Sequence, residues 1–350
     1  MSIKITSVVK GIPKYSRETP DILPLLKEWL KGHDESYQRK ARIIFNNAGV
    51  DKRYSIMDPE EVFTASSFEE KNLIYKRECT DLAEITSIKA LKKANLKADE
   101  IDYIISVSCT GIMIPSIDAY LINKLGMKQD IVRLPVTEMG CVAGVSALIY
   151  ANSFLKANPN KRALIVAIES PTATFQMDDF TLTNIVSAAI FGDGCSCAIL
   201  SSYEDEVGPE IIGDAMYHFY DSEHTMGFDL TNNGLKMVLD KNVPDKIEEH
   251  FPMIVHPFLE SYDMTIDDVD HLIFHPGGKK IVNTIEKLFG SLGKNINNTK
   301  AILREYGNMS SATVLYVLER FISQNPQKGD VGLMLSFGPG FTAQRLLLKW

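Results

Sequence analysis

Cys141 lies in a setting that suits a covalent nucleophile. It follows Gly140, which permits a tight turn, and it precedes the small residues 142–147, which are typical of the first turns of a buried helix. At a helix N-terminus, unpaired N–H groups and the helix dipole favour a thiolate over a thiol. A buried structural cysteine is the common alternative in an apolar stretch, so Cys141 alone leaves both interpretations open.

His275 and Asn308 could complete a site for carbanion chemistry. His275 ends an apolar segment before a Pro-Gly turn, and Asn308 follows Gly307 much as Cys141 follows Gly140. A thiol and an imidazole can hold a thiolate–imidazolium pair near neutral pH. Imidazole and amide N–H groups together can stabilise an enolate or a thioester oxyanion, which suits decarboxylation followed by attack on a thioester. Taken singly, they could be a strand-end histidine and a helix cap.

An internal repeat brings these residues into correspondence. Three segments of the second half match segments of the first half at offsets of 167 or 168 residues. The matched pairs are 267–275 with 99–107, 305–316 with 138–149, and 331–336 with 164–169. The repeat puts Asn308 where Cys141 stands in the first copy, so two glycine elbows related by a pseudo-twofold axis would point into one cleft.

The apolar segments alternate with helical patterns, which predicts an α/β protein. Strands are expected at 3–9, 163–168 and 195–200, and helices at 22–47 and 68–97. Such segments indicate mostly parallel sheets covered on both faces, built from two βαβ-type halves. We expect an N-terminal half, residues 1–202, with the cysteine, and a C-terminal half, residues 203–350, with the histidine and the asparagine.

Composition restricts the function further. The net charge of −8 argues against a nucleic-acid-binding protein. We see no signal peptide and no apolar run long enough to span a bilayer, so no membrane partner is expected. The five cysteines are irregularly spaced, which fits the reducing cytoplasm. No motif indicates a metal, a flavin or NAD; His271 and His275 have the spacing of a zinc helix but no third ligand.

The sequence resembles the chalcone synthase-like type III polyketide synthases of the thiolase superfamily over nearly its whole length. The motifs that carry the resemblance are Met-Gly-Cys-Val-Ala-Gly at 139–144, Phe-Gly-Asp-Gly at 191–194, His-Pro-Gly-Gly at 275–278, Tyr-Gly-Asn-Met-Ser-Ser-Ala at 306–312 and Phe-Gly-Pro-Gly-Phe at 337–341. The resemblance implies a thiolase-like fold in five layers, αβαβα.

The resemblance also implies roles for the site residues. Cys141 would carry the starter and the growing chain as a thioester, and His275 and Asn308 would promote decarboxylation of malonyl-CoA and stabilise the enolate. Phe191 would be an aromatic gatekeeper between the CoA tunnel and the chain cavity, and Ser310 would line that cavity. The substrates would be an acyl-CoA starter and malonyl-CoA, no separate cofactor is implied, and a homodimer is expected.

Several positions depart from the plant enzymes of this family. Met237 aligns with a second gatekeeper phenylalanine, Cys109 with a cavity threonine, and Phe228 falls near a cavity-wall glycine. Ile114 matches a loop that reaches across the dimer into the partner's cavity. These departures bear on the product more than on the chemistry.

The basic CoA-binding helix of the family aligns only loosely. Lys40 and Arg42 are the predicted phosphate contacts, within a cluster at the end of the helical pattern that a solvated helix face would also explain.

Two other functions are open, one enzymatic and one non-catalytic. A 3-oxoacyl synthase III acting on acyl carrier protein would use the same three residue types for a single condensation. A non-catalytic protein would bind acyl-CoA or scaffold a pathway, although the intact cysteine, histidine and asparagine argue against it. The sequence therefore favours a condensing acyltransferase.

Overall fold

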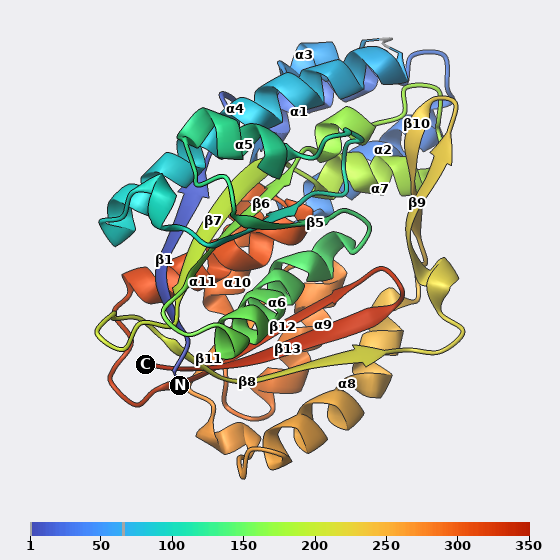
Figure 1. Cartoon of the computed structure of the whole chain (residues 1–350). Helices are drawn as coiled ribbons and strands as arrows, with labels where there is room; N and C mark the ends of the chain where they lie inside the picture. Colours follow the sequence, from blue (N-terminus) through green and yellow to red (C-terminus); the bar gives the residue numbers. More distant parts are fainter. Residues whose placement is uncertain (1, 65–66) are drawn as a thin grey trace.

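A computed structural model describes residues 2–64 and 67–350, and its strands repeat one arrangement twice (Figure 1). In the first half the strand order is β5-β4-β6-β7-β1, and in the second it is β11-β12-β13-β8. In both halves a parallel pair, β4–β6 or β11–β12, is followed by two antiparallel pairings. The halves meet where Lys4 pairs with Glu210, which joins nine described strands into one sheet.

The nine described strands include both members of the repeated pairs, β4 with β11 and β6 with β12. Their bounds are β1 Lys4–Gly11, β4 Tyr103–Val107, β5 Val132–Val136, β6 Arg162–Glu169, β7 Gly194–Ser201, β8 Glu210–His218, β11 His271–Phe274, β12 Val331–Gly338 and β13 Thr342–Lys349. The predicted α/β class and the duplicated βαβ halves are therefore confirmed. The expectation of mostly parallel sheets is wrong, because three of the eight pairings between described strands of this sheet are parallel and five are antiparallel. Short connections, such as residues 339–341 between β12 and β13, favour antiparallel pairing. The division into residues 1–202 and 203–350 stays a prediction.

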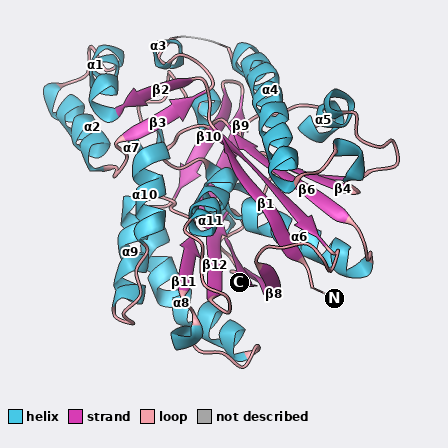
Figure 2. Ribbon diagram, turned by 90° about the vertical axis from the view of Figure 1, so that its left-hand side faces the viewer, coloured by secondary structure: helices cyan, strands magenta, loops and turns pink. Residues whose placement is uncertain are grey.

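Two helices, α6 (Ala143–Ala157) and α11 (Thr313–Ser323), form the central layer between the two groups of strands (Figures 1 and 2). A short 3₁₀ turn precedes each helix, Gly140–Val142 and Ser310–Ala312 respectively. Small residues let the two helix starts approach closely: a Cβ on Gly144 would lie 2.3 Å from the Ser311 carbonyl oxygen. The two glycine elbows of the repeat are thus neighbours.

Outer helices cover the exposed faces of both halves and complete five layers (Figure 2). On the N-terminal side these are α4 (Phe68–Ala94) and α5 (Ile117–Leu125), and on the C-terminal side α8 (Val243–Glu260) and α9 (Lys279–Gly290). The remaining α-helices are α1 Thr19–Trp29, α2 Glu35–Asn47, α3 Pro59–Val62, α7 Leu182–Ile190 and α10 Asn297–Tyr306. The predicted αβαβα layering is confirmed.

Two features differ from the sequence-based expectation. The helical pattern over 22–47 forms two helices, α1 and α2, because Gly32 takes φ +103° and the Asp34 side chain then caps α2 by accepting from the Tyr37 N–H at 2.9 Å. Within the second half, the chain after β8 also forms a hairpin, β9 (Met226–Thr231) with β10 (Gly234–Leu239), that stands apart from the main sheet (Figure 1). A second small pair joins β2 (Tyr15–Glu18) to β3 (Lys52–Ser55).

The segment Gly140–Ala157 has the length and mean hydropathy of a membrane-spanning helix. In the structure 67% of that segment is buried, because it is the central helix α6 with its preceding turn. Its apolar character is accounted for by packing between the two groups of strands.

Candidate active site

Cys141 projects from the turn that starts α6, and Gly140 makes that turn possible. Gly140 has φ +54°, and a Cβ there would lie 2.7 Å from the Pro339 ring. The Cys141 carbonyl accepts a hydrogen bond of 2.8 Å from the Ser336 hydroxyl, at the end of β12. The cysteine is therefore fixed from both halves of the molecule.

His275 follows β11 and is held by its backbone rather than by its ring. Its N–H donates to the Leu335 carbonyl at 3.0 Å, and its side chain is only 2% exposed. Neither ring nitrogen has a hydrogen-bond partner within residues 2–64 and 67–350. A buried imidazole with two unpartnered nitrogens is costly unless a ligand or water satisfies it.

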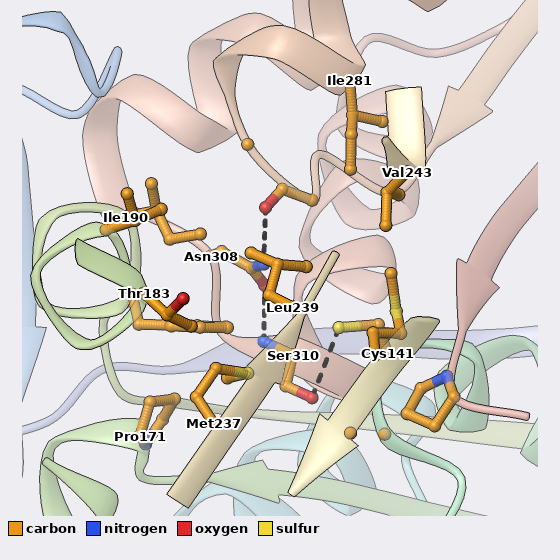
Figure 3. A pocket seen from close by; sticks show the side chains of 18 of the residues that line it. Cys141, Pro171, Thr183, Ile190, Met237, Leu239, Val243, Ile281, Asn308 and Ser310 are labelled. Atoms are coloured by element: carbon orange, nitrogen blue, oxygen red, sulfur yellow. Dashed lines mark hydrogen bonds between the residues drawn. The ribbon is translucent and has the colours of Figure 1, made fainter. Parts of the chain in front are cut away.

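Asn308 lies on the second glycine elbow with its amide held in one orientation (Figure 3). Its Nδ2 donates to the Gly277 carbonyl at 3.0 Å, and its Oδ1 accepts from the Ser310 N–H at 2.8 Å. One hydrogen of Nδ2 is used in this way, which leaves the other available as a donor. The link to Gly277 also ties Asn308 to the segment that carries His275.

These three side chains line a single cavity of about 840 Å³. Its walls are mostly apolar and include Ile190, Leu239, Val243 and Ile281 (Figure 3). The repeat thus brings a thiol, an imidazole and a carboxamide from three distant parts of the chain to one pocket.

Burial dominates the protonation of the two titratable groups. It raises the pKa of Cys141 to about 12, against hydrogen bonds from Ser310 and Asn308 that favour the thiolate. It lowers the pKa of His275 to about 3. Each group by itself is therefore neutral near pH 7, and burial outweighs the helix dipole. A thiolate–imidazolium pair requires the two groups to share one proton, and it stays a prediction.

Ser310 connects two cysteines of the pocket. Its hydroxyl lies 3.6 Å from the sulfur of Cys141 and 3.6 Å from the sulfur of Cys109. Cys109 is in turn held by Glu169, whose carboxylate accepts from the Cys109 N–H at 2.9 Å. Burial first, and the charge of Glu169 second, raise the pKa of Cys109 well above its usual value. Cys109 is thus a neutral residue of the cavity wall.

Comparison with known proteins assigns the family. Residues 27–204 match the N-terminal domain of chalcone and stilbene synthases, and residues 213–350 match the C-terminal domain. This chain belongs to the chalcone and stilbene synthase family. Phloroglucinol synthase of Pseudomonas fluorescens is 32% identical over 310 residues, 89% of each protein. The 1,3,6,8-tetrahydroxynaphthalene synthase of Streptomyces peucetius is 30% identical over 353 residues, 99% of this chain and 93% of the relative.

Solved structures agree with this assignment. The 1,3,6,8-tetrahydroxynaphthalene synthase of Streptomyces coelicolor, described as a bacterial type III polyketide synthase, matches with a TM-score of 0.92 and 30% identity over 100% of this chain and 99% of that one. The type III domain of Steely1 from Dictyostelium matches with a TM-score of 0.91 and 26% identity. The chain is a type III polyketide synthase and hence an acyl-transferring enzyme, as the sequence predicted. Neither the single-condensation alternative nor the scaffold alternative is favoured.

Five of the residues predicted to line the cavity do so in the structure. Phe191, Met237, Phe228, Cys109 and Ser310 all line the cavity. Met237 and Phe228 pair directly across the β9–β10 hairpin, so one local unit supplies both.

The remaining predicted residues lie away from the cavity walls. Ile114 does not line the cavity of its own chain and is 95% exposed. Lys40 and Arg42 are also absent from the walls; α2 contributes Ile43, Ile44 and Asn47 instead, and Ala48 follows it. Lys40 lies on the same helical face one turn earlier, and Arg42 does not. Phosphate binding by the two basic residues stays a prediction.

Sequence reasoning missed Glu169 as part of the site. This buried carboxylate accepts hydrogen bonds from the Cys109 N–H, the Thr110 hydroxyl at 2.8 Å and the Ser311 hydroxyl at 2.5 Å. Burial raises its pKa, against these hydrogen bonds. The sequence did contain a sign of this role, because Glu169 is a charged residue that directly follows the apolar strand predicted at 163–168.

Proposed function

We propose that the synthase loads an acyl-CoA starter on Cys141 and extends it with malonyl-CoA by decarboxylative Claisen condensation. The observation that carries this proposal is that Cys141, His275 and Asn308 line one apolar cavity and that His275 has two unpartnered nitrogens there. The relatives named for phloroglucinol and 1,3,6,8-tetrahydroxynaphthalene support an aromatic product, and we propose a pyrone, resorcinol or phloroglucinol type of release.

In the loading step, the Cys141 sulfur attacks the thioester carbonyl of the starter. The thiol proton passes to the imidazole of His275, which is neutral before the step, and the two opposite charges formed stabilise each other. The new bond joins the Cys141 sulfur to the acyl carbon, and the bond to the CoA sulfur breaks. CoA leaves as a thiol once it takes up the proton.

In the extension step, malonyl-CoA loses its carboxylate as CO₂ and the electron pair moves into the thioester as an enolate. One N–H of His275 and the spare N–H of Asn308 would donate to the enolate oxygen. Because the walls are apolar, the malonyl carboxylate is poorly solvated there, which favours its loss. The enolate carbon then attacks the acyl-Cys141 thioester, forms the new C–C bond and releases the cysteine.

A test follows from these separate roles. Cys141→Ala should abolish both acyl labelling by the starter and polyketide formation, measured by mass spectrometry of the protein and of the products. Asn308→Ala should still become acylated on Cys141 but should lose CO₂ release and condensation by about 100-fold or more. Full polyketide formation by Cys141→Ala would refute the proposal.

We also propose a cytoplasmic homodimer. All five cysteines are unpaired, as suits a reducing compartment. The edge strand β5 exposes Val132 at 47%, and the loop between β4 and α5 exposes Ile112 at 41% and Ile114 at 95%. A second copy covering this edge would bury them.

A further inference from the structure

We propose that the phosphates of CoA bind at the cavity mouth to Lys279, Lys280 and Lys241, and not to α2. This inference deepens the proposed function, since it names the residues that would hold the CoA moiety of both substrates. The cationic group comes from the start of α9 and from the segment between β10 and α8.

Lys279 and Lys280 directly follow the loop that carries His275. They are the first two residues of α9, both are exposed, and both line the same cavity as Cys141. Neither makes an ion pair within the described part of the chain, and the same holds for Lys241. Three cations without acidic partners at one mouth are suited to a polyanion.

The position of Lys279 extends this cationic group to the end of α2. Gly49 lies just after α2. A Cβ added to Gly49 would lie 3.4 Å from the Cβ and Cδ atoms of Lys279. The α2 face that lines the cavity presents Ile43, Ile44 and Asn47, none of which carries a charge, and the last turn of α2 has no basic residue. At the mouth, α2 therefore offers apolar contact to the pantetheine arm, while α9 supplies the charge.

The lining of the cavity also carries negative charge. Two acidic residues, Glu138 and Asp240, also line the cavity. The Asp240 carboxylate already accepts a hydrogen bond of 2.9 Å from the Asn242 N–H. CoA carries a diphosphate and a 3′-phosphate, so its negative charge exceeds what one lysine neutralises. The first N–H groups of α9, which have no helical partner, add donors beside Lys279 and Lys280.

The test compares two thioesters of the same acyl group. Malonyl-CoA and malonyl-N-acetylcysteamine present the same reacting atoms, but only the first has phosphates. In the double variant Lys279→Ala/Lys280→Ala, KM for malonyl-CoA should rise about 10-fold with kcat within twofold, since each exposed ion pair contributes modestly. KM for malonyl-N-acetylcysteamine should stay unchanged. Added salt should raise KM for malonyl-CoA in the wild type more than in the variant.

Two further variants make the result decisive. Lys287→Ala, at the other end of α9 where Lys287 pairs with Glu248, should behave as the wild type does. Lys40→Ala/Arg42→Ala tests the rival site on α2. An unchanged KM for malonyl-CoA in the α9 variant, or a rise confined to the α2 variant, would overturn the inference. If the wild-type protein turned over neither thioester, this result would instead refute the proposed function.

Discussion

The central residue-scale question is how a buried thiol becomes reactive. Burial keeps Cys141 and His275 neutral when each is considered alone, so neither group is activated by its own surroundings. A proton moved from sulfur to imidazole would create two opposite charges that stabilise each other in a medium of low dielectric constant. We therefore predict that activation of Cys141 depends on His275.

Alkylation of Cys141 by iodoacetamide tests this dependence. In His275→Ala, the rate should rise steadily through pH 10 without levelling off, because burial raises the pKa of Cys141 to about 12 when no imidazole accepts the proton. In the wild type, the rate should level off at a lower pH. The measurement is mass spectrometry of the peptide that contains Cys141. Superimposable pH profiles for the two proteins would contradict the assignment of His275 as the proton acceptor.

At this scale the sequence predicted what the repeat encodes. Cys141 and Asn308 could be paired because they occupy equivalent positions, and His275 because it ends a repeated strand. Glu169 escaped prediction since its importance arises from three hydroxyl and amide donors that meet only in the folded chain. The cationic mouth was missed for a similar reason: Lys279 and Lys280 follow a recognised motif, but their exposure beside the cavity depends on where α9 begins.

At the scale of elements, the glycine elbow before α6 should tolerate no side chain. Gly140→Ala combines two costs: a strained backbone at φ +54° and a Cβ placed 2.7 Å from Pro339. Gly126→Ala provides a matched control, since Gly126 has φ +64° with nothing within 4 Å. We expect about 1–2 kcal/mol of destabilisation for the control and about 1–3 kcal/mol more for Gly140→Ala.

The two glycine variants should also differ in function. Gly140→Ala should lose acyl labelling because the shift displaces Cys141, whereas Gly126→Ala should keep it. Urea unfolding and starter labelling provide the two measurements. Equal stability and equal labelling of both variants would show that contact with Pro339 does not position the nucleophile.

The turn after Phe191 holds another testable element, the buried carboxylate of Asp193. It accepts hydrogen bonds from the Ile56 N–H at 2.8 Å and from Thr172 and Ser170, yet burial raises its pKa to about 6. The folded protein therefore binds a proton more tightly than the unfolded chain, whose aspartate has a pKa near 3.9. Stability should fall as pH rises from about 4 to about 6, by about 3 kcal/mol.

Asp193→Asn removes this titration. The variant should be less stable, by about 1–3 kcal/mol at neutral pH, because one amide oxygen cannot accept every donor. Its deficit relative to the wild type should be largest near pH 4 and should shrink as pH rises to 6. Urea unfolding of both proteins at several pH values measures the difference, and a deficit independent of pH would mean that Asp193 titrates normally.

The elements themselves were predictable where the hydrophobic pattern is long and regular. The strands at 163–168 and 195–200 and the helix at 68–97 correspond to β6, β7 and α4. The prediction of one helix over 22–47 was wrong. The apolar spacing continues across Gly32, but the backbone angles of Gly32 interrupt the helix. The β9–β10 hairpin lacks a counterpart in the first half, so the repeat gave no guide to it.

At the scale of the whole molecule, duplication explains both the fold and the location of the site. Two copies of one unit face each other, and their equivalent helix starts meet at the contact of Gly144 with Ser311. Divergence of the two elbows then supplied a thiol on one side and an amide on the other. The chain carries the proposed nucleophile in one half and the proposed oxyanion donors in the other, so neither half contains the complete set.

The exposed edge near β5 leads to the last prediction, which concerns assembly. Ile114 is 95% exposed in the single chain, and Val207, in the loop between β7 and β8, is 86% exposed. In the proposed homodimer, with a mass about twice 39.1 kDa, Ile114 would be buried and Val207 would stay accessible. Maleimide should therefore label Val207→Cys at least 10-fold faster than Ile114→Cys, scored by peptide mass spectrometry to exclude the native cysteines. Light scattering gives the mass of each variant.

Equal labelling rates in a protein of dimeric mass would place the interface elsewhere. A monomeric mass would refute the assembly, because the exposed apolar edge would then have no partner to cover it.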